Sequence, residues 1–391
     1  MVQGAGVRRA ETIRVGLAGL GGASARILPA FSRVEGIELV AGADVGERAR
    51  AAFSDACNLP ACSSVEELCR RPDVDAVYVA TPNRLHSEHA VLAARAGKHV
   101  VCEKPMAVTL DECDRMMAAV EDAGVLLVQG YSKIFATPLR AMREIIDSGR
   151  LGRVIHLDSW NFNDWLRRPR TAEEVDSRQE GGVVLRQAPI QVEIAMYLLG
   201  GVPRAVRATT GRWCPRIATE GNFAALIEFE DQRTASLSFN GYGYLNIEEL
   251  LPGAGSDAFW EDRIPPVQPD GVVSAGEKFM RNRRRGGNAR STGSIPEHPF
   301  SGLTIVHCER GALRQSRDGL FVYTDEGREE VAVPPDTGRA AGLAELRDAI
   351  REGRPARPDG SWGRALVAVC LAIPESSRTG RDVCLRSRID G

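Results

Sequence analysis

The feature that most constrains the fold is a glycine-rich turn between an apolar strand and a helical segment. From Ile13 the chain reads IRVGLAGLGGASARILPAF. Such a turn places backbone N–H groups and the positive end of a helix where a pyrophosphate can bind. We expect Gly19 to make the tight turn and Gly21 and Gly22 to lie against the phosphates, whereas Ser24 replaces the third fingerprint glycine.

A carboxylate follows the second predicted strand. The segment IELVAGAD ends at Asp44, 25 positions beyond Gly19, close to the roughly 20-residue spacing of a carboxylate that accepts ribose hydroxyls. Its charge repels the additional phosphate of NADP(H), so the sequence favours NAD(H), whereas the nearby Arg48 keeps NADP(H) possible. The alternative role for Asp44 is that of a strand-end turn former.

Strands and helices alternate through the rest of this half. VDAVYVATP and KHVVCEKP are predicted strands, and the helical segment from His86 to Ala96 lies between them. This alternation predicts a parallel sheet covered on both faces, with ligands at the carboxyl ends of the strands. We therefore assign residues 1–133 to a Rossmann domain of an α/β protein. The cofactor-contacting candidates on these loops are Thr81, Pro82, Asn83, His86, Glu103 and Lys104.

Composition excludes several other classes. The formal net charge of −2 gives no global field for nucleic acid or an anionic membrane, and no apolar run approaches the roughly 20 residues of a membrane helix. Nine cysteines occur without a CxxC pair, which favours a reducing cytoplasm. Neither cysteines nor histidines have metal-ligand spacing, so no metal is expected. We expect a small-molecule substrate and no nucleic-acid or membrane partner.

The segment ATPNRLHSEHAVLAARAGKHVVCEKP resembles the hallmark of the Gfo/Idh/MocA oxidoreductases, which ends in the tripeptide EKP. The resemblance implies that Lys104 lies beside the nicotinamide and the substrate, as a proton donor or carrier. It extends over residues 12 to 385. Within the family, three later stretches are similar to phthalate cis-dihydrodiol dehydrogenases: NFNDWLRRPRTAEEVDSRQEGG, TEGNFAALIEFEDQRTASLSFNGY and DGSWGRALVAVCLAI.

The same resemblance implies a C-terminal α+β domain, residues 134–391, built on a large and mostly antiparallel sheet whose outer face often mediates oligomerisation. A homodimer or homotetramer is therefore expected. Short β-rich segments separated by turn residues agree with this domain, among them RAVRATTGRW and TASLSFNGY. The last two helical segments are expected to return to the Rossmann domain or the domain interface. Pro374 is expected to interrupt or end the second of them.

One departure from the family concerns its catalytic histidine. Members usually carry a glycine-rich segment followed by an HxxD motif, but this chain reads GGVVLRQAPIQVEIAMYLLGG. Aligning Gly181 and Gly182 puts Ile190 in the histidine position and Glu193 in the aspartate position. Isoleucine cannot move a proton, and loss of a general base costs about 100- to 10,000-fold in rate when nothing replaces it.

Three interpretations follow from this departure. Lys104 can carry the proton, assisted by Glu193, Gln187 or Tyr131. The substrate can need little base, as for a reduced ring that gains aromaticity or an imine that accepts hydride. Alternatively, net hydride transfer is lost, and the protein is a redox-neutral lyase or isomerase with tightly bound NAD, or a non-catalytic dinucleotide-binding protein.

Polar residues in the second half are candidates for substrate contacts. An arginine pair in NFNDWLRRPR would suit a substrate carboxylate, although ordinary surface ion pairs are the alternative. Arg186 stands where many relatives carry an acid, which indicates a substrate unlike the common sugars. The full candidate set is Asn161, Asp164, Arg167, Arg168, Arg186, Gln187 and Ile190.

The stretch from Pro252 to Phe300 is rich in turn-forming residues and too long for an ordinary loop. It could cover the mouth of the active site, reach a neighbouring subunit, or supply His298 in place of the missing histidine. The sequence as a whole predicts an NAD(P)-dependent oxidoreductase. Its expected substrate is small, cyclic and polar: a dihydrodiol, a ring carboxylic acid or an imine.

Overall fold

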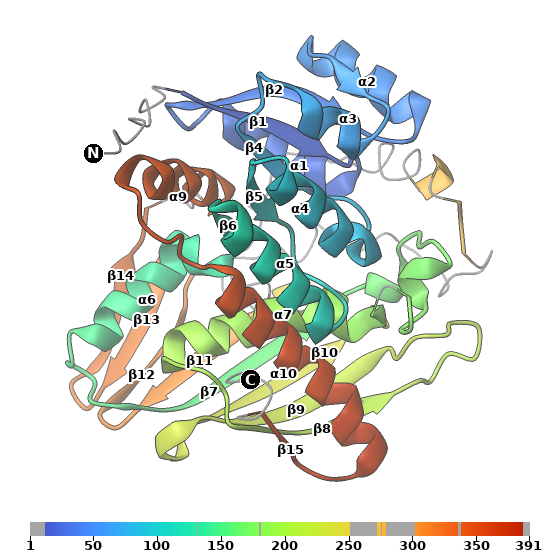
Figure 1. Ribbon diagram of the computed structural model, residues 1–391. Coiled ribbons are helices and arrows are strands. Elements are labelled where there is room, and N and C mark those ends of the chain that lie inside the picture. The colour runs from blue at the N-terminus through green and yellow to red at the C-terminus, as the bar shows by residue number, and fades with distance from the viewer. Residues whose placement is uncertain are drawn as a thin grey trace. The chain divides into compact units, whose positions relative to one another are not determined.

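The computed structural model describes residues 12–130, 132–179, 181–250, 272–274, 276–278, 302–334 and 338–385. The described chain forms two compact units. The first takes in residues 12–106, 111–130 and 339–362, and the second takes in 107–110, the described parts of 132–338, and 363–385. Each unit is built around its own sheet (Figure 1).

The first unit is a six-stranded parallel sheet with the order β3-β2-β1-β4-β5-β6. Its strands are β1 (Ile13–Ala18), β2 (Ile37–Ala43), β3 (Ala61–Cys62), β4 (Ala76–Val79), β5 (His99–Cys102) and β6 (Leu127–Gln129). Its helices are α1 (Gly22–Phe31), α2 (Glu47–Cys57), α3 (Val65–Arg70), α4 (His86–Arg95), α5 (Leu110–Ala123) and α9 (Gly338–Glu352). The order reverses between β1 and β4, which is where dinucleotides bind in such sheets. The predicted Rossmann fold is confirmed.

The core of this unit explains its strand pattern. Every residue of β4, AVYV, is buried, as expected for a strand covered on both faces. Ile13, Val15 and Leu17 of β1 belong to the same hydrophobic cluster as Leu343 and Leu346 of α9. A helix more than 300 residues along the chain therefore completes the core of the N-terminal sheet.

The second unit is a nine-stranded sheet with the order β14-β13-β12-β11-β7-β10-β9-β8-β15. Only the β10–β7 pair is parallel among its described pairings, so the predicted, mostly antiparallel sheet is confirmed. Its strands are β7 (Val154–Phe162), β8 (Ala205–Gly211), β9 (Asn222–Glu228), β10 (Thr234–Asn240), β11 (Leu303–Cys308), β12 (Gly311–Gln315), β13 (Gly319–Thr324), β14 (Gly327–Ala332) and β15 (Val383–Cys384).

Helix α7 (Gly182–Leu199) covers the middle of this sheet (Figure 1). The Gln191 amide donates to the carbonyl oxygens of Ser159 on β7 and Ser238 on β10, at 3.0 and 3.2 Å. The unit also contains α6 (Thr137–Asp147) and α10 (Gly360–Thr379). Short 3-10 helices complete the two units: η1 (Asn83–Leu85), η2 (Lys133–Phe135), η3 (Trp165–Arg167), η4 (Glu173–Val175), η5 (Glu230–Gln232) and η6 (Ile247–Leu250).

Helix α10 runs through Pro374 to Thr379, so the predicted interruption at this proline is wrong. An interior proline removes a helical hydrogen bond and costs about 3 kcal/mol. Burial offsets that cost, because Cys370, Ala372 and Ile373 are fully buried. The hydroxyl of Ser376 accepts the N–H of Ala208 at 2.9 Å, which also ties this last turn to β8.

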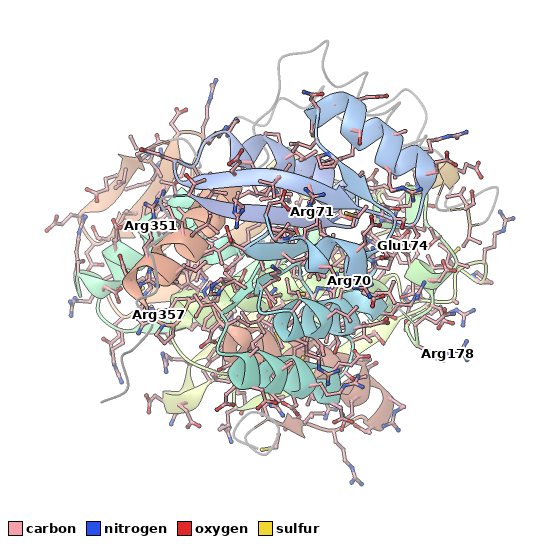
Figure 2. All side chains as sticks on the ribbon, turned by 45° about the horizontal axis from the view of Figure 1, so that its top comes forward. Arg70, Arg71, Glu174, Arg178, Arg351 and Arg357 are labelled. Carbon is pink, nitrogen blue, oxygen red and sulfur yellow. The ribbon has the colours of Figure 1, made fainter. Side chains whose placement is uncertain are left out.

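Charged side chains pair along the outside of the units. Arg70 pairs with Glu66, and the well-exposed Arg178 pairs with Asp176 (Figure 2). Such pairs are typical of a solvated surface and contribute little to stability. No helix within the described ranges combines the length and apolarity needed to cross a membrane.

Candidate cofactor and substrate sites

Gly19, directly after β1, makes the predicted tight turn. Its φ is +85°, a conformation that glycine adopts at no steric cost. A β-carbon at this position would lie 2.7 Å from the carbonyl oxygen of Ala80, at the end of β4. The turn therefore passes against the neighbouring strand so closely that only glycine fits.

The start of α1 is open. Gly21 is the N-cap, no side chain caps the helix, and its first turn carries no acidic residue. A β-carbon added at Gly21 or Gly22 would meet no atom within 4 Å. Ser24, which replaces the third fingerprint glycine, is buried and donates its hydroxyl to the carbonyl oxygen of Gly19. This hydrogen bond holds the helix against the turn. The open N-terminus fits a pyrophosphate.

Asp44, directly after β2, is tied to the glycine turn. Its carboxylate accepts the N–H of Leu20 and the N–H of Gly46, both at 2.8 Å. Each carboxylate oxygen can accept a second hydrogen bond, so a ribose hydroxyl can still be bound. Arg48 is exposed, and Arg50 donates to the backbone carbonyl of Asp44 at 2.8 Å.

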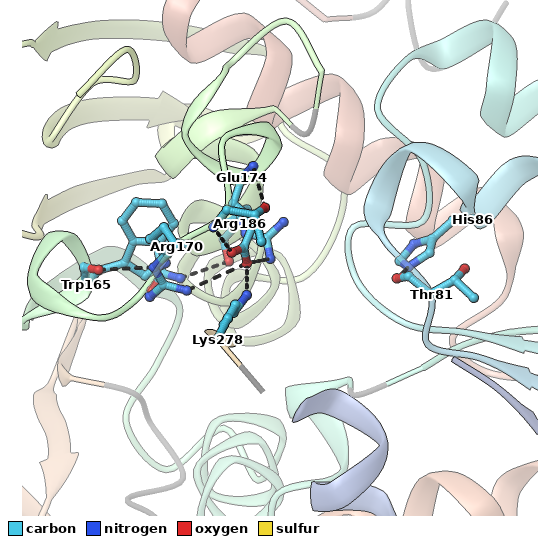
Figure 3. A network of polar contacts seen from close by, with 9 residues as sticks. Thr81, His86, Trp165, Arg170, Glu174, Arg186 and Lys278 are labelled. Carbon is cyan, nitrogen blue, oxygen red and sulfur yellow. Dashed lines mark hydrogen bonds and ion pairs between the residues drawn. The ribbon is translucent and has the colours of Figure 1, made fainter. Parts of the chain in front are cut away.

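The loop after β4 is joined to the EKP loop by His86. Its Nδ1 lies 2.8 Å from the carbonyl oxygen of Pro105, and its Nε2 lies 2.9 Å from that of Thr81 (Figure 3). Each ring nitrogen therefore contacts a backbone carbonyl oxygen of a different loop. Asn83 is buried and Pro82 is exposed. His86 therefore fixes the two predicted cofactor loops relative to each other.

Glu103 and Lys104 differ in environment. The buried Glu103 carboxylate accepts the Tyr78 hydroxyl at 3.0 Å and pairs with Arg339 of α9 at 3.4 Å. Burial, together with the Glu103 charge, holds the pKa of Tyr78 well above its usual value. Lys104 is partly exposed. The EKP tripeptide thus has an anchoring carboxylate followed by a partly exposed lysine.

Glu193 of α7 is also anchored. Its carboxylate accepts the Ser132 hydroxyl at 2.5 Å and the backbone N–H of Lys133 at 2.6 Å, and all three residues are buried. It therefore holds the segment that leads into η2. Tyr131, the other predicted assistant, lies outside the described residues, as does His298.

The accessible face of α7 carries three of the predicted substrate residues. Arg186, Gln187 and Ile190 are partly exposed, whereas the other residues from Gly182 to Met196 are buried. Residues 186 and 190 are one helical turn apart, about 6 Å along the axis. The structure therefore brings Arg186 and Ile190, the residue predicted to stand in the histidine position, onto one face of α7.

The stretch after β7 places its polar residues differently. Asn161 is buried on the α7 side of β7 and accepts the Asn163 amide at 3.1 Å. Arg168 pairs with Asp164 at 2.6 Å on the surface. Arg167 is buried, donates to the carbonyl oxygen of Tyr242, and lies over the Tyr244 ring at 4.5 Å. These two guanidiniums thus form separate contacts.

A charged cluster in the second unit was missed by sequence reasoning. Arg170, Arg186 and Lys278 converge on Oε1 of Glu174 (Figure 3). The distance is 2.6 Å from Arg186 and 3.8 Å from Arg170. Oε2 of Glu174 accepts the N–H of Thr171 at 2.9 Å. Only the density of arginines in RRPR could have hinted at this cluster, because Lys278 comes from a distant segment.

Burial and charge oppose each other in this cluster. Burial lowers the pKa of Arg170 to about 9, although Glu174 raises it. Burial also lowers the pKa of Lys278. For Glu174 burial acts in the opposite direction, but Arg186, Lys278 and Arg170 outweigh it and lower the pKa to about 2. Glu174 therefore stays ionised at any physiological pH.

The groups that the first unit offers fit a nicotinamide dinucleotide. The open start of α1 offers donors to phosphates, and Asp44 offers acceptors to a ribose. In the described parts of the chain, no group of three or more His, Cys, Asp or Glu side chains is arranged to hold a metal ion.

Comparisons with known proteins agree with this fold. Residues 13–131 match the model of an oxidoreductase family with an NAD-binding Rossmann fold, and residues 139–246 match the GFO/IDH/MocA C-terminal domain. A 1-carboxy-3-chloro-3,4-dihydroxycyclohexa-1,5-diene dehydrogenase of Comamonas testosteroni is 34% identical over 386 residues, 94% of this chain and 95% of that one.

Solved structures are also similar. A protein from Bordetella bronchiseptica RB50, described as a dehydrogenase, has a TM-score of 0.78 and 35% identity, covering 95% of this chain and 100% of that chain. Levoglucosan dehydrogenase in complex with NADH has a TM-score of 0.74 and 20% identity, covering 95% and 99%. At that identity the second likeness concerns the fold alone.

Proposed function

Since the chain belongs to the Gfo/Idh/MocA family of NAD(P)-dependent oxidoreductases, we propose that it dehydrogenates a ring dihydrodiol. The relative from Comamonas, similar over nearly the whole chain, carries a dihydroxycyclohexadiene in its name. The observation that carries the proposal is Ile190, an apolar side chain on the accessible face of α7 where the family places its histidine.

Oxidation of a dihydrodiol can proceed in a site that lacks the family's histidine. Bound nicotinamide would accept the hydride that leaves a ring carbon, while the hydroxyl proton on that carbon is released and a C=O bond forms. The resulting ketone tautomerises to a catechol, and the aromaticity gained supplies driving force. Less base assistance is then needed than for a sugar alcohol, so loss of the histidine costs less.

Lys104 is our proposed proton acceptor. Lys104 is partly exposed and follows an anchored glutamate. Glu193 accepts hydrogen bonds with both of its oxygens. Glu193 is better suited to positioning the Ser132–Lys133 segment, and any role for Gln187 would be secondary.

We propose NAD(H) as the preferred cofactor. The Asp44 carboxylate would repel the additional phosphate of NADP(H), and the exposed Arg48 is four residues away. We also propose a cytoplasmic location, supported by nine free cysteines. A homodimer or homotetramer is proposed as well and is considered below with the outer face of the large sheet.

The test is turnover of a carboxylated cis-dihydrodiol with NAD⁺, following NADH at 340 nm and catechol by chromatography. We expect one NADH per catechol. We expect Lys104→Met to lower kcat by about 100-fold or more, with NADH affinity retained, and Lys104→Arg to be equally impaired if proton transfer is the role. Full turnover in Lys104→Met with normal NADH binding would refute the assignment of Lys104.

A redox-neutral reaction is the alternative that the missing histidine favours. Purified protein should first be denatured and its released nucleotide measured. Little retained nucleotide, with binding of added NADH, is expected for a dehydrogenase. Near-stoichiometric retained NAD(H), together with product formed without net NADH, would instead indicate a lyase or isomerase that recycles its cofactor.

A further inference from the structure

The cluster around Glu174 has a buried layer and an accessible layer. The side chains of Arg170 and Glu174 are 10% and 6% exposed, whereas those of Arg186 and Lys278 are 21% and 23% exposed. Arg170 is further held by the Trp165 ring, 4.0 Å from its guanidinium carbon, and by the Trp165 carbonyl oxygen at 3.2 Å. The buried pair thus supports two cations that a ligand can reach.

Three cations in the cluster share one carboxylate. Three cations converge on one carboxylate oxygen, and the only other Glu174 oxygen accepts the Thr171 N–H. Charges that lie close together in a poorly solvated place are costly unless they are paired. Burial lowers the pKa of Arg170 and of Lys278, and the neighbouring cations lower it further. A substrate carboxylate at Arg186 and Lys278 would add a negative charge to the cluster.

The cluster includes a residue of the same helix as Ile190, which was predicted to stand in the histidine position. Arg186 shares the accessible face of α7 with Ile190, one turn away, about 6 Å along the helix. That separation is comparable with the length of a carboxylated six-membered ring. Val273, five residues before Lys278, donates its N–H to the Arg170 carbonyl oxygen at 2.8 Å, so both Val273 and Lys278 contact the cluster.

We propose that Arg186 and Lys278 bind a carboxylate group of the substrate, and that Glu174 and Arg170 position them. This inference rests on the proposed dihydrodiol dehydrogenation and specifies its substrate as a ring acid. Arginine binds carboxylates through paired N–H donors, and lysine adds a point charge. Ile190 then contacts the apolar part of the ring, which explains an isoleucine one turn from a cation.

The first test is equilibrium binding of unreactive ring compounds to the full chain, by calorimetry. We expect benzoate to bind at least tenfold more tightly than benzamide. Arg186→Gln and Lys278→Gln should each weaken benzoate binding at least tenfold, whereas Arg186→Lys should retain part of it. Arg178→Gln is the matched control, because Arg178 is eight positions before Arg186 in the sequence, is 89% exposed and points outward (Figure 2).

Unchanged benzoate affinity in Arg186→Gln and Lys278→Gln would overturn the proposal. Phenyl phosphate is the second probe, since a phosphate would meet the same cations. If it binds tenfold more tightly than benzoate through the same two residues, the carboxylate assignment is wrong. NADH affinity and the thermal midpoint of each variant report whether the chain is folded.

A second measurement does not depend on losing a side chain. The chain has only four lysines, at positions 98, 104, 133 and 278, so ¹³C-dimethylation, which keeps their charge, gives few NMR signals. Lys278→Arg identifies one of them. We expect that signal to shift on adding benzoate and not on adding benzamide, with the Lys98 signal unmoved. A Lys278 signal whose chemical shift does not change on adding benzoate would overturn the proposal.

Turnover separates this inference from the proposed function. We expect kcat/KM for a carboxylated dihydrodiol to exceed that for the same diol without the carboxylate by at least tenfold, and Arg186→Gln to abolish the difference. Equal kcat/KM for the two diols would refute the proposed carboxylate site, while the proposed dehydrogenase activity would still be supported. Carboxylate binding through Arg186 and Lys278 without oxidation of any diol would support the carboxylate site and refute the dehydrogenase activity.

Discussion

Asp44 can serve two functions with a single carboxylate. It accepts the N–H groups of Leu20 and Gly46, which fixes the glycine turn against the end of β2, and each of its oxygens can accept a second hydrogen bond, as the proposed contact with a ribose requires. The turn-forming role and the cofactor role that the sequence left as alternatives are therefore physically compatible.

Replacing Asp44 by serine should affect both functions. Loss of the negative charge should raise kcat/KM with NADP⁺ relative to NAD⁺ by at least tenfold. Two backbone donors would lose their acceptor, at a cost of about 1–3 kcal/mol, so the thermal midpoint should fall. Steady-state kinetics with both cofactors and a thermal melt measure these effects. An unchanged cofactor ratio would show that Asp44 is a turn former only.

At the scale of elements, α7 shows why a helix start is not always an anion site. A β-carbon at Gly182, whose φ is +58°, would lie 2.3 Å from the hydroxyl oxygens of Ser177 and Thr219. Two N–H groups in the first turn, which have no partner within the helix, donate to side chains from elsewhere. Val183 donates to Thr219 Oγ1 at 2.9 Å, and Val184 donates to Glu220 Oε1 at 2.7 Å. The start of α1 has no such side-chain cap, which suits it to phosphate.

The contact between η4 and α7 through Glu174 should make stability depend on pH. The folded pKa of Glu174 is about 2, below the ordinary value of 4.5. Its ionised form therefore stabilises the fold fully above pH 4.5, and this contribution is lost as the pH falls towards 2. The difference in pKa corresponds to a stabilisation on the order of 3 kcal/mol.

Thermal unfolding of the wild type and of Glu174→Gln between pH 7 and pH 3 measures this effect. We expect the variant to melt at a lower temperature at neutral pH and the gap to narrow below pH 4.5. Glu66→Gln is the control, because Glu66 is well exposed and pairs with the exposed Arg70, and such pairs contribute little. A gap that stays constant with pH would contradict the argument.

At the scale of the whole molecule, the outer face of the nine-stranded sheet bears on oligomeric state. Trp160 of β7 is 39% exposed and Leu226 of β9 is 41% exposed, both on the face of the sheet opposite α7. Exposed large apolar side chains on one face favour contact with another chain. This supports the homodimer or homotetramer proposed above.

Light scattering after size-exclusion chromatography should give a mass of two or four chains for the wild type. Trp160→Glu should shift the mass towards one chain, because a charge would be buried in the interface, while NADH affinity stays unchanged. Ser236→Glu introduces a charge on the same face and provides a second variant. A wild type that elutes as a monomer at micromolar concentration would refute the oligomer.

The sequence by itself determined the Rossmann half. A glycine turn, the alternation of strands and helices, and the spacing from Gly19 to Asp44 are short-range patterns, because periodicity and turn chemistry act between near neighbours. Alignment with the family on Gly181 and Gly182 places Ile190 in the histidine position. Local reasoning failed at Pro374, where burial of the surrounding helix outweighs the local preference of proline.

Only the tertiary structure decided which charges meet. Glu174 and Lys278 are 104 residues apart, and Glu193 reaches Ser132 across 61 residues. With 50 lysines and arginines against 52 acids, residue type alone cannot select these partners. An ion pair forms where packing brings two side chains together and removes water, and packing is settled by contacts between distant segments.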